Sequence, residues 1–76
     1  PKYEPDIYLE AAKRLSLTAG ECMVFEDAPY AGVTAKKAGF ALCGMPDPAY
    51  AEGEDTLRQV SDMFVEHSFA ELAGKL

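Results

Sequence analysis

The apolar residues of the chain fall into short segments that suit alternating helices and strands. Helices are expected at residues 6–15, 30–38, 54–60 and 68–76. Strands are expected at residues 22–25, 40–45 and 63–65. The first two strands are continuous apolar runs without alternation, which is typical of parallel strands covered on both faces. With connections of only a few residues, this order predicts an α/β fold with a three-layer α/β/α, Rossmann-like parallel sheet.

Local signals mark the ends of the first two helices. Pro5 suits the first turn of a helix, after which Ile7, Ala11 and Leu15 recur on one helical face. The second helix is expected to stop at Gly39, a good C-terminal cap.

Two connecting segments carry turn signals. Residues 18–21 form a turn with a capping-box pattern, Thr18 to Glu21. Residues 46–53 contain two prolines and a glycine, so no regular structure is expected there. This loop follows the carboxyl end of the second strand, where loops of parallel sheets often contact ligands.

Composition limits the classes of partner. The chain has 76 residues, a formal net charge of −6 and a pI near 4.5, which disfavour a nucleic-acid backbone as partner. Its apolar stretches are far too short to span a membrane, so a cytoplasmic protein is the default expectation. Cys22 and Cys43 lie inside apolar runs and are expected to be buried free thiols.

The length of the chain points to a part of a larger domain. A unit of this size buries only about 60% of its unfolded surface, and three short strands are few for a parallel sheet. The sequence also begins with Pro1 rather than Met. We therefore expect a fragment whose sheet continues into polypeptide outside these residues.

The adjacent acids Glu26 and Asp27 directly follow the first apolar strand. Carboxylates at the carboxyl end of a parallel strand are well placed to meet a ligand, and Mg²⁺ prefers such hard oxygen donors. The alternative is that one acid caps the following helix and the other is solvated. Position alone does not separate these two interpretations.

A lysine ahead of the first helix favours the metal-binding interpretation of Glu26 and Asp27. The chain reads Lys-Tyr-Glu-Pro-Asp-Ile-Tyr at residues 2–8 and Val-Phe-Glu-Asp-Ala-Pro at residues 24–29. Two such motifs at this spacing resemble the haloacid-dehalogenase-like hydrolase superfamily, and within it the branch of β-phosphoglucomutase and small phosphatases. By this resemblance, residues 1–76 would be the C-terminal part of the core domain.

The resemblance also implies roles for three residues. Lys2 would face the phosphoryl group and the attacking carboxylate, while Glu26 and Asp27 would bind Mg²⁺, with Asp27 the stronger candidate. A fixed ammonium and a divalent cation would stabilise the charge that builds up during phosphoryl transfer.

Several features depart from the family pattern. Tyr3 follows the lysine where Pro is common, and the loop after Asp27 is one residue longer, which could move Tyr30 toward or away from the site. No Asp-x-Asp nucleophile motif occurs in the 76 residues. The missing N-terminal half of the domain, with its nucleophile, and a substrate-selecting cap would have to lie elsewhere.

The resulting expectation is a Mg²⁺-dependent phosphatase acting on a small phosphorylated metabolite through an aspartyl-phosphate, with this fragment inactive alone. A sugar-phosphate mutase of the β-phosphoglucomutase type, a phosphonate hydrolase and a non-catalytic α/β binding or assembly module are the alternatives. Tyr50 is a weaker candidate for substrate contact. His67 and the acids at 52, 54 and 55 are expected to be surface residues.

Overall fold

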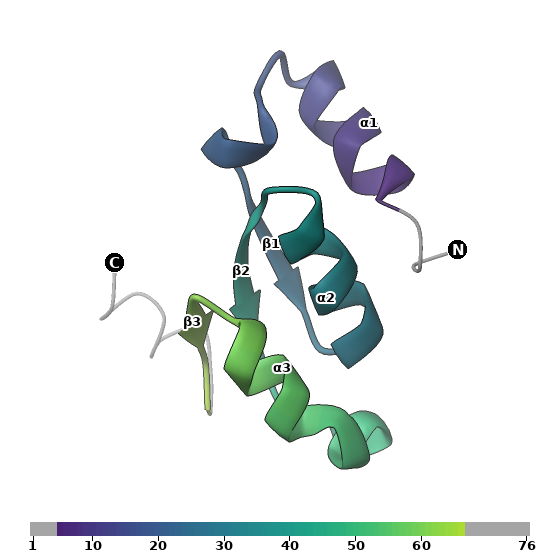
Figure 1. The fold of residues 1–76 in the computed structure, drawn as a ribbon, viewed down its shortest axis with the longest axis vertical. Helices are drawn as coiled ribbons and strands as arrows, with labels where there is room; N and C mark the ends of the chain where they lie inside the picture. The colour runs from purple at the N-terminus through teal and green to yellow at the C-terminus, as the bar shows by residue number, and fades with distance from the viewer. Residues whose placement is uncertain (1–4, 67–76) are drawn as a thin grey trace.

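A computed structural model describes residues 5–66 of the chain (Figure 1). The elements of this part are, in chain order, α1 (Asp6–Arg14), the 3₁₀ helix η1 (Ala19–Glu21), β1 (Met23–Glu26), α2 (Pro29–Lys37), β2 (Ala41–Gly44), the 3₁₀ helix η2 (Pro48–Gly53), α3 (Glu54–Val60) and β3 (Met63–Phe64). Within residues 5–66, no helix has both the length and the apolar content needed to cross a bilayer.

The three strands form one parallel sheet in the order β1-β2-β3. In the register of the first pair, Met23 lies opposite Ala41 and Glu26 lies opposite Gly44. Helices connect successive strands, as parallel pairing requires. The sequence-based expectation of a Rossmann-like parallel α/β sheet is therefore confirmed.

Helices cover one face of this sheet. Leu42 of β2 is fully buried, and it lies between α2 and α3 near Gly32 and Leu57. Val24, in register with Leu42, packs against the cluster of Ala12, Ala35 and Phe40 and so extends the same covered face. Figure 1 shows α2 and α3 side by side along the sheet. Close packing of small and large apolar residues across this layer forms the core.

The opposite face of the sheet is also apolar. Cys43 and Val65 are buried there, with Met23 and Met63 packed against them. This two-sided burial is what the apolar run of β2 predicted. The same prediction fails for β1 in the described residues, where Phe25 is 45% exposed and Met23 and Val24 are half-buried. The helix expected at residues 68–76 lies outside the described residues. Both cysteines are free thiols, Cys43 buried and Cys22 half-buried.

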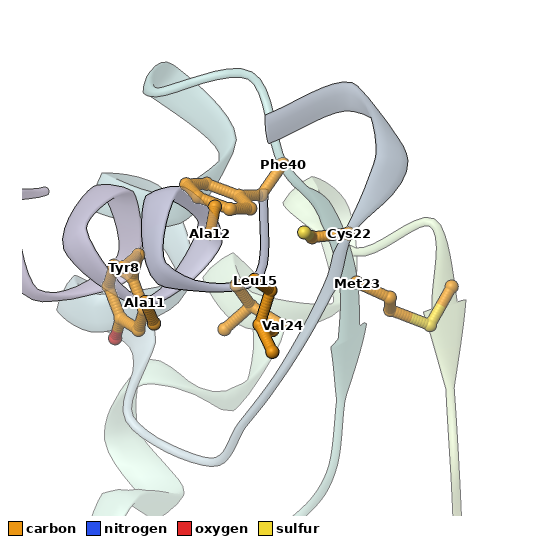
Figure 2. A pocket seen from close by; sticks show the side chains of 8 residues that line it. All are labelled: Tyr8, Ala11, Ala12, Leu15, Cys22, Met23, Val24 and Phe40. Carbon is orange, nitrogen blue, oxygen red and sulfur yellow. The ribbon is translucent and has the colours of Figure 1, made fainter. Parts of the chain in front are cut away.

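Helix α1 ends within one residue of its predicted end, but its packing differs from its apolar stripe. Ile7 and Leu15 are each 67% exposed, while Ala12 and Tyr8 pack on the core. An apolar groove of about 160 Å³ runs between α1 and β1 (Figure 2). The apolar stripe of residues 7, 11 and 15 thus predicted the helix correctly. In the described residues, however, the side of α1 that packs on the core is the one that carries Tyr8 and Ala12.

Residues 46–53 were expected to lack regular structure, and this prediction is wrong. Residues 48–53 form η2. The Asp47 carboxylate accepts a hydrogen bond from the backbone N–H of Ala49 at 2.9 Å and caps the first turn. Pro48 occupies that first turn, where a helix needs no N–H from it. Pro48 therefore starts this short helix.

Other predicted boundaries are confirmed to within one residue. The capping box is present, with the N–H of Thr18 donating to the Glu21 carboxylate at 2.9 Å. Gly39 follows α2 with φ of +96°, in the left-handed region that favours glycine. The N–H of Phe40 reaches back to the carbonyl of Ala35 at 3.1 Å and closes the helix end. Helix α3 has the predicted bounds.

Substitution of Gly32 tests the close packing of α2 against Leu42 of β2 and Leu57 of α3. Helix propensity alone predicts that Gly32→Ala stabilises the fold by about 1 kcal/mol. The structure predicts the reverse, because an added Cβ would lie 2.7 Å from Leu57 Cδ1 and 3.1 Å from Leu42 Cδ2. We expect a loss of about 1–3 kcal/mol in the free energy of unfolding, measured with urea on the intact protein. Gly20→Ala is the matched control, since its nearest neighbour would be 4.0 Å away. A gain for Gly32→Ala would contradict the packing described here.

Asp62 fixes β3 beside β2. Its carboxylate accepts the backbone N–H of Leu42 at 2.7 Å, while its own N–H donates to the carbonyl of Leu42 at 2.9 Å. Lys36 adds an ion pair at 3.0 Å. The Leu42 N–H and, next, the Lys36 ammonium hold the pKa of Asp62 below its ordinary value. A side chain thus extends the backbone ladder between the two strands.

The lowered pKa of Asp62 gives a pH-dependent prediction. Its contribution to stability is fully present above the unfolded-state pKa of about 3.9 and disappears as pH falls through the lower folded-state pKa. Asp62→Asn keeps an acceptor for Leu42 and loses only the exposed ion pair, so we expect a cost of about 0.5 kcal/mol near neutral pH. Asp62→Ala should cost about 1–2 kcal/mol, because the N–H of Leu42 loses its acceptor.

Urea unfolding across pH measures this effect. The difference in the free energy of unfolding between wild type and Asp62→Asn should shrink on acidification. A difference that stays constant with pH would contradict the role given to the Asp62 carboxylate.

Candidate functional site

The loops that follow β1 and β2 bring three acidic side chains to one end of the sheet. Glu26, the last residue of β1, lies opposite Gly44, the last residue of β2. The two chains therefore leave the sheet side by side, and Asp27 and Asp47 follow within a few residues. In parallel α/β sheets this carboxyl end is where ligands bind.

Glu26 is turned inward and is only 9% exposed. Its Oε2 accepts a hydrogen bond from the Tyr8 hydroxyl at 3.0 Å, which ties α1 to the end of β1. Its Oε1 accepts the N–H groups of Asp27 and Ala28 at 3.2 and 3.3 Å. Burial and the hydrogen bond to Glu26 raise the pKa of Tyr8 to about 12, so the phenol stays a donor at neutral pH.

The contacts of Glu26 bear on the alternative interpretation, in which one of the two acids caps the helix that follows. Ala28 is the N-cap residue of α2, so the Glu26 carboxylate does support the start of the following helix. The Mg²⁺ role of Glu26 remains a prediction. Because both of its oxygens already accept hydrogen bonds, Glu26 is better placed to orient the strand end than to face a ligand.

Asp27 faces a second carboxylate. Its side chain, which is half-buried, is a hydrogen-bond partner of Asp47 from the loop after β2. Burial raises the pKa of the Asp27 carboxyl, and the nearby carboxyls of Asp47 and Glu26 raise it further. For Asp47 the N–H of Ala49 lowers the pKa, and the contact with Asp27 lowers it further. Of the two carboxyls, Asp27 therefore binds a proton more readily than Asp47.

Asp47 was not among the site residues predicted from the sequence. Residues 46–53 were expected to form a loop suited to ligand contact, with only Tyr50 as a candidate within it. An acid two residues after an apolar strand, like Asp27 after the neighbouring strand, was the available signal. This signal predicts a pair of carboxylates only when β1 and β2 are known to be neighbours in the sheet.

The inserted Tyr30 lies toward the site. Its ring packs edge-on against Tyr50 of η2, with the centroids 6.3 Å apart and an interplanar angle of 73°. Tyr50 is close enough to Asp27 and Asp47 for their charges to raise the pKa of its hydroxyl, after the larger effect of Tyr30. The two tyrosines thus stand beside the carboxylate pair.

The donor set suits a hard cation. Mg²⁺ is usually held by one or two protein carboxylates, with water and substrate phosphate completing its shell. Asp27 and Asp47 supply such a pair. Within residues 5–66 no three His, Cys, Asp or Glu side chains form a metal-binding group, so a closed all-protein site is absent there. Lys2 and His67 lie outside the described residues.

The apolar groove is separate from this site. Its lining comes from α1, β1, Cys22 and Phe40, and Tyr8 supplies the one hydroxyl group among its side chains (Figure 2). The carboxylates do not line it. A phosphate group needs charged or polar partners, so the groove does not suit one.

The carboxylate pair yields a direct prediction. Asp47→Asn keeps an oxygen that can accept the N–H of Ala49 but removes one of two neighbouring negative charges. Without divalent cations, we expect this change to raise the Tm of the intact protein at neutral pH. Because a raised pKa of Asp27 means that its ionisation opposes folding as pH rises, the gain should be smaller in acid. An unchanged Tm at neutral pH would show that the two carboxyls do not interact.

Comparison with curated proteins gives two relatives, both with phosphatase in their names. The chain is 39% identical over 46 residues to "Putative phosphatase YhcW" of Bacillus subtilis (strain 168), a match covering 60% of this chain and 21% of that protein. It is 31% identical over 70 residues to the "Bifunctional riboflavin kinase/FMN phosphatase" of Arabidopsis thaliana, covering 86% of this chain and 18% of that protein.

These matches are partial. The matched residues span about a fifth of the length of each relative. No family model matches the chain, and no solved structure matches it significantly. The carboxylates at the end of a parallel sheet therefore belong to a chain that is similar to part of two proteins named as phosphatases.

Proposed function

We propose that the intact protein is a Mg²⁺-dependent phosphatase of the haloacid-dehalogenase-like type, which acts on a small phosphorylated metabolite. The observation that carries the proposal is the placement of Asp27 at the carboxyl end of β1, beside Asp47 from the neighbouring strand end. The similarity to two proteins named as phosphatases supports it.

Charge explains why such a site would need a cation. Glu26, Asp27 and Asp47 gather negative charge at the sheet end of a chain whose net charge is already −6. A phosphate dianion would be repelled there. A divalent cation reverses the local sign and polarises the phosphoryl oxygens.

Each residue then has a distinct task. Asp27 would bind the cation directly, with Asp47 as the second available carboxylate. Glu26 would hold the strand end in place through its hydrogen bonds to Tyr8 and to the N–H groups of Asp27 and Ala28. Lys2 would neutralise charge on the phosphoryl group.

The reaction needs a nucleophile from outside this chain. In the first step of the proposed reaction, a carboxylate of the intact protein attacks phosphorus and the ester P–O bond breaks. The leaving oxygen takes up a proton. Water then hydrolyses the aspartyl-phosphate and releases inorganic phosphate. Residues 1–76 alone would be inactive, because they contain no Asp-x-Asp motif.

Asp27→Asn in the intact protein tests the proposal. We expect kcat/KM for a generic aryl phosphate in saturating Mg²⁺ to fall on the order of 100-fold, because a metal-binding carboxylate is lost. Asp55→Asn, at an exposed acid in the first turn of α3, is the matched control and should leave kcat/KM unchanged.

A binding measurement separates loss of metal from loss of structure. Mg²⁺ should raise the Tm of the wild type and of Asp55→Asn, since a ligand that binds the folded state stabilises it. It should not raise the Tm of Asp27→Asn. Wild-type hydrolysis that is indifferent to a chelator, or equal Mg²⁺ stabilisation of all three proteins, would contradict the proposed site.

A further inference from the structure

The 3₁₀ helix η2 and its N-cap residue Asp47 lie against Asp27 and the first turn of α2 through three contacts, which are spaced three residues apart along the segment. Asp47 pairs with Asp27, the ring of Tyr50 packs on Tyr30, and Gly53 lies against Pro29. Side chains three residues apart lie on one side of a 3₁₀ helix, although the backbone bends at Tyr50 with φ of −121° and ψ of 25°. The contacts themselves therefore place Asp47, Tyr50 and Gly53 on the side of this segment that faces Asp27 and the start of α2.

Space allows η2 to come this close only because residue 53 is glycine. A Cβ at Gly53 would collide with the ring of Pro29. At the other end, Asp47 caps η2 through the N–H of Ala49. Tyr50 is thus held between two fixed points, next to the carboxylates.

The tyrosine pair presents an aromatic surface to solvent at the mouth of the site. Tyr30 is 36% exposed and Tyr50 is partly exposed. The edge-on arrangement is a favourable geometry for two rings, and a hydrogen bond between the hydroxyls adds to it. A third ring could pack on this surface in the same way.

We propose that Tyr50, supported by Tyr30, is a specificity-determining residue that contacts the leaving group of the phosphorylated substrate and favours an alcohol that carries a ring. This inference rests on the proposed function, because a phosphate held at Asp27 places its ester group at the mouth of the site. Ring-to-ring packing supplies the preference for a ring.

Benzyl phosphate and n-propyl phosphate form a suitable pair of probes. Both are neutral-alcohol esters with leaving alcohols of similar acidity, and they differ in the ring. For the intact wild-type protein in saturating Mg²⁺, we expect a higher kcat/KM with benzyl phosphate.

Tyr50→Leu keeps an apolar side chain and removes the ring. We expect it to lower kcat/KM for benzyl phosphate about 3- to 10-fold and to change kcat/KM for n-propyl phosphate less than about twofold. Tyr50→Phe, which keeps the ring, should retain the preference. The Tm of each variant, with and without Mg²⁺, checks that the fold and the cation site are intact.

The outcomes separate this inference from the proposed function. Hydrolysis of neither ester by the wild type would contradict the proposed function and this inference with it. Hydrolysis of both esters, with equal losses in Tyr50→Leu or with no preference in the wild type, would contradict the inference alone. Loss of the preference in Tyr50→Phe would also overturn it, since the ring would then not be the cause.

Discussion

The buried carboxylate of Glu26 is the interaction on which the arrangement of this chain depends. A carboxylate at 9% exposure has lost most of its hydration, so its oxygens need donors from the protein. They obtain them from Tyr8 on α1 and from the N–H groups of Asp27 and Ala28 at the start of the loop to α2. One side chain thereby connects α1, β1 and α2, and sets the direction in which the chain leaves the sheet.

That direction decides the chemistry of the neighbouring residue. With Glu26 turned inward, Asp27 extends toward the loop after β2 and meets Asp47. The parallel pairing of β1 and β2 places these two loops side by side, and the packing of Gly53 on Pro29 keeps them there. A pair of repelling carboxylates and a pair of packed tyrosines result from the same contact between two loops.

Sequence patterns predicted the elements well because they depend on local interactions. Gly39 ends α2 through its own backbone freedom, and Glu21 closes the capping box with Thr18 only three residues away. The expectation of an irregular loop at residues 46–53 failed because Asp47 caps a turn that Pro48 can start. The expectation of phosphate chemistry came instead from the resemblance of two motifs, at residues 2–8 and 24–29, to a known family, and the metal-binding roles of Glu26 and Asp27 stay predictions.

The sequence by itself determined the alternation of helices and strands, the parallel sheet and the candidate acids after β1, since each follows from neighbours along the chain. Only the tertiary structure decided that Glu26 turns inward, that Asp27 pairs with Asp47 and that Tyr30 meets Tyr50. These contacts join residues about twenty positions apart. They arise because parallel pairing of β1 with β2 brings both strand ends to one edge, and no periodicity within a single segment encodes that proximity.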